Sequence, residues 1–215
     1  MRENSNRKER QKAKTQILKR VEETLQAAII GLEDLIKGPP ERKVAGLRNL
    51  IVFGRAVTNV LQNLRSAEST FDEWYEKYKV EMKSDPLMRY FYKLRTEILK
   101  EGKLKFFPHV YIKQLRIPQD LRHFGPPPPN AKGFFIGDQL GGSGWEIQFP
   151  DGSIEKLYVQ LPYDIGVISL HFPNPPEFHI GHRIEDNSIE ALSRMYMDYI
   201  GRLVSLAKEK FNLGG

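Results

Sequence analysis

The feature that most constrains the fold is a change of sequence pattern at Gly102. Before it, apolar residues recur at steps of three and four, which is the spacing of one face of a helix. After it, short alternating segments are separated by proline-rich and glycine-rich breaks, which is typical of strands and turns. The pattern predicts an α+β protein, with an N-terminal antiparallel helical bundle followed by a small antiparallel β-sheet and a C-terminal helix. We expect two domains, residues 1–102 and residues 103–215.

Four helices are predicted in the first half of the chain. Their apolar stripes place them at about residues 6–37, 41–65, 70–83 and 85–102. Gly46 and Gly54 lower the helix propensity of the second segment, so we expect them to mark close approach of another helix. In the fourth segment, Ser84 or Asp85 is expected to be the N-cap, and Gly102 the left-handed residue after the last turn.

The second half of the chain is predicted to contain one well-defined hairpin. Its first strand, Trp145–Phe149, alternates strictly between apolar and polar residues. A turn at Asp151-Gly152 follows, and the strand pattern resumes through Leu161. Further strands are predicted within residues 106–117, 133–137 and 167–172. We expect a last helix, from about Ser188 to Phe211, to cover the sheet.

Composition excludes several kinds of site. The chain has no cysteine, which excludes disulfides, thiolate metal ligands and a cysteine nucleophile. The glycine-rich segment 137–144 lacks the lysine and the following helix of a P-loop, so we predict a flexible loop there and no bound cofactor. No stretch approaches the roughly 18 apolar residues of a membrane span, and the N-terminus lacks the apolar core of a signal peptide. We therefore expect a cytoplasmic protein that does not bind a membrane.

The formal net charge of +6 permits contact with nucleic acid or with an acidic surface. Much of the positive excess lies in the first twenty residues, which we call the basic arm. Its basic residues are Arg2, Arg7, Lys8, Arg10, Lys12, Lys14, Lys19 and Arg20. Two interpretations remain open, an arm that binds nucleic acid and a solvated, partly frayed helix end.

The second predicted helix also carries a polar stripe. Arg48, Arg55, Asn59 and Gln62 follow one another at offsets of seven, four and three residues, so their side chains project together. Guanidinium groups match the geometry of phosphate, which favours a phosphate or RNA contact surface. The alternative is an ordinary solvated helix face.

With the two long helices before it, the segment Asp85–Gly102 resembles the HEPN superfamily, helical bundles that are common in toxin–antitoxin, antiphage and RNA-processing systems. In that family a late helix carries an arginine, often followed by a polar residue, and then a histidine five positions on. The resemblance implies a metal-independent RNase site that is completed by dimerisation. Arg95 and Thr96 match the first part of the motif, whereas Lys100 stands where the family has histidine. Lysine is a poor proton acceptor near pH 7, so the resemblance implies RNA binding by Arg95 and Lys100 rather than cleavage.

Three histidines lie close together in the second half, at His171, His179 and His182. With the carboxylates of Glu177 and Asp186 they supply the ligand types of zinc or non-haem iron. Their spacing is not diagnostic, because a proline-rich break interrupts the segment. We therefore keep a metal site as the weaker alternative to ordinary histidines at a sheet edge.

The favoured function is an RNA-binding or partner-binding module of a bacterial or archaeal defence or regulatory system, without catalysis. It is expected to form a homodimer or larger homo-oligomer and to bind RNA or a protein partner. The candidate nucleic-acid-binding residues are Arg48, Arg55, Asn59, Arg95 and Lys100. The alternatives are a metal-independent RNase of HEPN type with Arg95 as its catalytic residue, a hydrolase using the histidine-rich segment, and a structural homo-oligomer.

Overall fold

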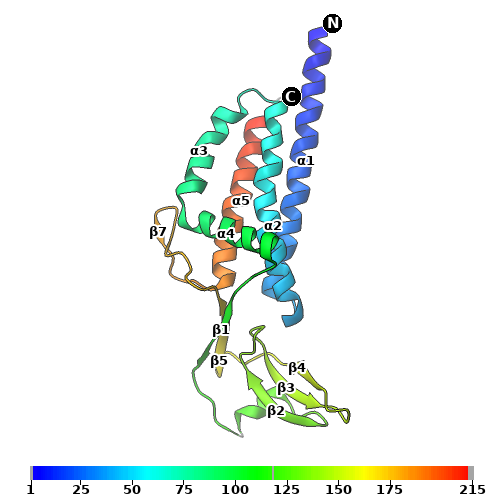
Figure 1. Cartoon of the computed structure of the whole chain (residues 1–215), viewed down its shortest axis with the longest axis vertical. Helices are drawn as coiled ribbons and strands as arrows, with labels where there is room; N and C mark the ends of the chain where they lie inside the picture. Colours follow the sequence, from blue (N-terminus) through cyan, green and yellow to red (C-terminus); the bar gives the residue numbers. More distant parts are fainter. Residues whose placement is uncertain (1, 118, 213–215) are drawn as a thin grey trace.

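The described chain is an elongated helical bundle with a β unit attached at one end (Figure 1). This computed structural model describes residues 2–117 and 119–212, and the side chains of residues 2–6 and 212 are outside that description. The helices are α1 (Arg2–Lys37), α2 (Pro40–Leu61), α3 (Phe71–Ser84), α4 (Pro86–Glu101) and α5 (Ile189–Asn212). Short 3-10 helices occur at η1 (Gln62–Ser66) and η2 (Asp120–Phe124). The predicted α+β class and the order of its parts are confirmed.

The strands form three separate antiparallel sheets among the described residues. Their bounds are β1 (Phe107–Ile112), β2 (Ala131–Ile136), β3 (Ser143–Gln148), β4 (Ile154–Tyr158), β5 (Gly166–His171), β6 (Phe178–His179) and β7 (His182–Arg183). Strand β1 pairs with β5, strands β2, β3 and β4 form a three-stranded sheet, and β6 pairs with β7. The predicted hairpin is confirmed: Trp145 faces Leu157 across the ladder, and the Phe149 carbonyl accepts the Gly152 N–H in the turn.

Helix α5 closes the core of the bundle. Tyr196 of α5 is buried and stacks on Phe91 of α4, with ring centroids 4.2 Å apart. Near the other end of α5, Phe211 packs edge-on against Trp74 of α3. The prediction that the last helix covers the sheet is therefore wrong. Its apolar face completes the bundle, whereas the sheet has a small core of its own around Trp145.

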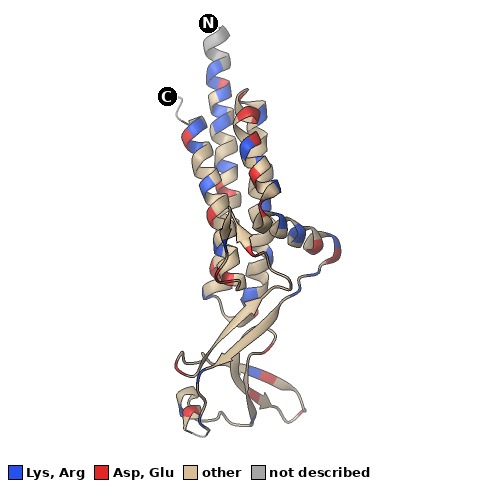
Figure 2. Ribbon diagram, turned by 90° about the vertical axis from the view of Figure 1, so that its left-hand side faces the viewer, with Lys and Arg blue, Asp and Glu red and all other residues tan. Residues whose placement is uncertain are grey.

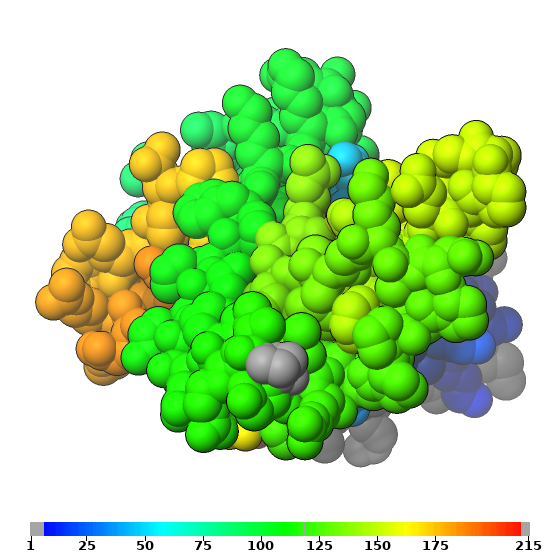
Figure 3. All heavy atoms as spheres, turned by 90° about the horizontal axis from the view of Figure 1, so that it is seen from below, coloured from blue at the N-terminus to red at the C-terminus, as the bar shows by residue number. Residues whose placement is uncertain are grey.

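The helical unit therefore combines the segment that precedes Gly102 with the segment that follows Ser188. The β unit is inserted between them, and β1 and β5 run side by side as the connection between the two units (Figure 1). Seen from below, the β unit covers much of the lower end of the bundle, and the hairpin of β6 and β7 lies at one side in orange (Figure 3).

Glycines allow α1 and α2 to pack in close contact. A Cβ atom added at Gly46 would stand 2.6 Å from the Gly31 carbonyl oxygen and 2.6 Å from Asp34 Cβ. A Cβ atom at Gly54 would stand 2.6 Å from Cε1 of Tyr196. Real side chains do not tolerate such distances, so both positions need a residue without a Cβ. The prediction that Gly46 and Gly54 mark close helix approach is confirmed.

The glycine-rich segment 137–144 forms a hydrogen-bonded turn that leads into β3. The Asp138 carboxylate accepts hydrogen bonds from the backbone N–H groups of Leu140 and Gly142 and from the Tyr158 hydroxyl. Burial acts to raise the pKa of Asp138, but these hydrogen bonds outweigh it and leave the pKa below its ordinary value. The charged carboxylate therefore organises the turn.

The segment Pro40–Ser66 is long and apolar enough to cross a membrane by length and composition, although the sequence was expected to contain no such stretch. In the structure 44% of its most apolar window is buried inside the protein. Helix α2 contacts α1, α4 and α5, so its apolar character is that of a central bundle helix.

Replacing Gly46 by alanine should lower the free energy of unfolding by about 1–3 kcal/mol, because the new methyl group forces α1 and α2 apart. The matched control is Gly201→Ala in α5, where no atom lies within 4 Å of an added Cβ. That change should raise the free energy of unfolding by up to about 1 kcal/mol through helix propensity alone. Urea unfolding followed by circular dichroism measures both, and equal effects would contradict the close packing.

Candidate functional site: an unpaired arginine pair

The charges of Arg55 in α2 and of Arg95 in α4 both act on the phenol of Tyr196 in α5. Burial raises the pKa of Tyr196, and these two positive charges oppose that rise. The guanidinium carbon of Arg55 also lies 5.7 Å from the ring centroid of Tyr92. Gly54 lets the Tyr196 ring lie against α2. We call this group of Arg55, Arg95, Tyr92 and Tyr196 the arginine site.

The arginine site has positive charge without a described counter-charge. Nη1 of Arg55 and Nε of Arg95 are buried and have no hydrogen-bond partner among the described residues. Within the described side chains, neither arginine takes part in an ion pair. A buried donor without an acceptor carries a desolvation cost of about 1–3 kcal/mol, more when it is charged.

The structure does not bring the other predicted contact residues into this site. Arg48 donates a hydrogen bond of 2.9 Å to the Gly102 carbonyl, so it ties α2 to the end of α4. Gln62, at the start of η1, donates to the Thr58 carbonyl near the end of α2. Asn59 and Lys100 are exposed. The residues of the predicted polar stripe therefore do not act as one group, and of them only Arg55 belongs to the arginine site.

The three histidines do not form a common site. His179 Nδ1 lies 3.0 Å from the Asp85 carboxylate, and His171 Nε2 lies 2.8 Å from Ser169 Oγ. His182 is exposed on β7, opposite His179 in the ladder. Over residues 2–117 and 119–212, no group of three His, Cys, Asp or Glu side chains is placed to hold a metal ion.

Asp85 does more than the N-capping that its position predicted. Its carboxylate is almost fully buried and accepts the Met88 N–H at 2.9 Å as the cap of α4. It also accepts the Ile180 N–H at 2.7 Å and bonds to His179, which fixes the hairpin of β6 and β7 to the bundle. The turn of that hairpin has positive φ at both Ile180 and Gly181, a conformation that a β-branched residue rarely adopts. Sequence inspection missed this hairpin because isoleucine is not a turn residue.

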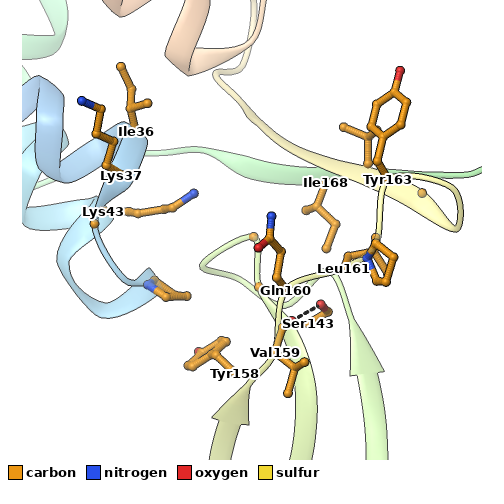
Figure 4. Close-up of a pocket in the computed structure, with 17 residues that line it drawn as sticks. Ile36, Lys37, Lys43, Ser143, Tyr158, Val159, Gln160, Leu161, Tyr163 and Ile168 are labelled. Atoms are coloured by element: carbon orange, nitrogen blue, oxygen red, sulfur yellow. Dashed lines mark hydrogen bonds between the residues drawn. The ribbon is translucent and has the colours of Figure 1, made fainter. Parts of the chain in front are cut away.

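A cleft of about 720 Å³ separates the bundle from the β unit (Figure 4). Lys43 from α2 and Gln160 from the segment after β4 project toward the same space. The described lining contains Lys37 and Lys43 but no acidic residue. Lys43 already lies 3.7 Å from the Glu190 carboxylate, so its charge has a counter-charge. The described side chains give the two arginines of the arginine site no such partner.

The basic arm forms the first part of α1, whose end extends beyond the neighbouring helices (Figures 1 and 2). Lys14 pairs with Glu68 at 3.2 Å, which fixes the arm to the segment before α3. The side chains of Arg7, Lys8 and Arg10 are exposed. The side chain of Arg2 lies outside the described residues.

Residues 34–117 match the family model described as Bacteriophage lambda protein ea47. The chain is similar to that family from the end of α1 through β1, a segment that contains Arg55, Asp85 and Arg95. No curated protein and no solved structure matches the chain. The resemblance to the HEPN superfamily stays a prediction.

Replacing Asp85 by alanine should lower the free energy of unfolding by about 2–4 kcal/mol, because it leaves the buried N–H groups of Met88 and Ile180 without acceptors. The control is Asp186→Ala, which removes an exposed carboxylate that accepts a single backbone hydrogen bond, from Ser188. Its cost should be about 1 kcal/mol or less. Urea unfolding compares the two variants, and equal losses would show that Asp85 acts only as an ordinary cap.

Proposed function

We propose that this chain is a nucleic-acid-binding protein that holds an RNA phosphate at the arginine site and does not cleave the RNA. The observation that carries the proposal is the pair of buried, unpartnered guanidinium nitrogens, Arg55 Nη1 and Arg95 Nε. Each is a charged donor whose hydrogen bond is missing, and phosphate offers several acceptor oxygens to a pair of such groups.

The charge of the rest of the chain supports a polyanion as the ligand. The net charge is +6, and exposed basic residues such as Arg7, Lys8 and Arg10 lie near the start of α1. Positive charge spread over several elements attracts a long anion at a distance, whereas a single carboxylate ligand would need only the arginine site.

The chemistry around Arg95 favours binding over cleavage. Cleavage without a metal needs a group that accepts and returns a proton near neutral pH. Tyr196 belongs to the same site, and burial raises its pKa, which keeps its phenol protonated. His179 is held at Asp85, ten residues before Arg95 and about 15 Å away along the axis of α4. One chain therefore does not place this imidazole and Arg95 on the same phosphate.

The likeness of residues 34–117 to a phage lambda protein supports a role in the interaction between phage and host. We propose regulation or defence as the setting, with RNA as the molecule recognised. A homodimer would place two arginine sites on one RNA strand and increase its apparent affinity.

Removing either arginine should weaken RNA binding and reduce its salt dependence. For labelled oligouridine, the slope of log affinity against log salt should fall by about 0.7 for each of Arg55→Ala and Arg95→Ala, since each removes a phosphate contact. Arg89→Ala is the matched control, because Arg89 is exposed on the same helix α4 and has the same charge. Fluorescence anisotropy at several salt concentrations gives these slopes.

The same set of proteins tests the competing functions. Equal slopes for all three variants, or no complex of the wild-type protein at low salt, would contradict the proposal. Metal-independent cleavage of the RNA by the wild-type protein, lost in Arg95→Ala but kept in Arg89→Ala, would establish the RNase alternative instead.

A further inference from the structure

One face of the β1–β5 ribbon carries four rings, and three of them, Phe107, His109 and Tyr111, are exposed. The ladder places Phe107 opposite His171, His109 opposite Ser169, and Tyr111 opposite Val167. These six residues share a face because side chains alternate along a strand, and we call them the ribbon face. The His171 ring lies 6.1 Å from the Phe107 ring and 5.6 Å from the His109 ring, measured between centroids.

The two faces of the ribbon have different surroundings. The opposite face carries Val110, Ile168 and Leu170, and it packs against the ordered glycine-rich turn near Gly137 and Gly141. On the ribbon face, by contrast, Phe107 is 48% exposed and Tyr111 is 60% exposed. The exposed rings therefore lie on the side of the ribbon that faces away from the glycine-rich turn.

Positive charge lies at both ends of the ribbon face. Neither β1 nor β5 contains an acidic residue, and both are drawn without charge in Figure 2. Exposed Lys105 precedes β1 and exposed Lys113 follows it. Lys113 Nζ also lies 3.0 Å from the ring centroid of Tyr163, which adds another exposed ring at that end. The ribbon face thus combines apolar rings with flanking cations.

We propose that the ribbon face binds single-stranded nucleic acid by stacking its bases on Phe107 and Tyr111. This inference rests on the proposed function, because it supplies base contacts to a strand whose phosphates are held by basic groups. Ring surfaces flanked by lysines are complementary to a strand that alternates flat bases with negative phosphates. A purely apolar partner would gain nothing from Lys105 and Lys113.

The geometry selects a single strand over a duplex. In a duplex the flat surfaces of the bases are stacked on one another and are closed to side chains. Residues two positions apart on a strand stand about 7 Å apart, so Phe107 and Tyr111 are separated by about 14 Å along β1. They therefore contact different bases, and the His109 ring lies between them on the same face.

The test compares three labelled probes on the full-length chain by fluorescence anisotropy. The probes are twelve-nucleotide oligouridine, twelve-nucleotide oligothymidine and a twelve-base-pair RNA duplex, which separate RNA from DNA and single from double strands. The variant is Phe107→Leu with Tyr111→Leu, which keeps apolar side chains in the ribbon but removes both flat rings. Phe178→Leu is the control, because Phe178 is a similarly exposed ring on β6.

The double variant should bind the better single-stranded probe at least about 30-fold more weakly, with an unchanged salt slope, because the lost contacts are to bases. The control should bind like the wild-type protein, and the wild-type protein should prefer single strands to the duplex. Equal affinity of the wild-type protein for duplex and single strand would overturn the proposal. So would wild-type affinity in the double variant.

The outcomes also separate this inference from the proposed function. If the ring variant keeps its affinity while Arg55→Ala and Arg95→Ala flatten the salt slope, the ribbon proposal fails and the arginine site stands. If the ring variant loses affinity while both arginine variants behave like the wild-type protein, the ribbon binds the strand and the arginine site does not. Absence of binding to all three probes at low salt would overturn both.

Discussion

The packing of α5 against α2 and α4 is the interaction on which the rest of the structure depends. Tyr196 stacks on Phe91 and lies against the bare backbone at Gly54, so one ring joins three helices. The same ring belongs to the arginine site, since the charges of Arg55 and Arg95 both act on its phenol. A core residue of the last helix of the chain is therefore also part of a site formed by earlier helices. Stability and the candidate binding site share this residue.

Local signals in the sequence were reliable where their physical cause is local. Gly102 has φ of 65° and ends α4 as predicted, because a left-handed residue after the last turn is favourable for glycine alone. The turn at Asp151-Gly152 likewise follows from its own residues. The position of α5 was not predictable in this way. Its apolar stripe predicts that one face of the helix is buried. The stripe does not indicate whether that face packs against a sheet or against other helices.

The candidate site shows the same division. Spacing along α2 predicted that Arg55 and Arg48 act together. In the structure the Arg48 guanidinium instead donates a hydrogen bond to the Gly102 carbonyl at the end of α4. The partner of Arg55 is Arg95, forty residues later, and no periodicity connects two helices. Only one of the two roles of Asp85 was predictable from the sequence, because capping is a local property. Its hydrogen bonds to His179 and Ile180 depend on a hairpin that the sequence did not predict.

The antiparallel pairing of β1 with β5 has a topological consequence. The chain leaves the bundle after α4 and returns to it before α5 through neighbouring strands, so the β unit is an inserted domain with adjacent ends. An insertion of this kind makes little demand on its host, because a short turn would close the same gap at a small cost in loop entropy. The family match covers residues 34–117, so in the bundle it runs from the end of α1 through α4, and in the β unit it includes only β1.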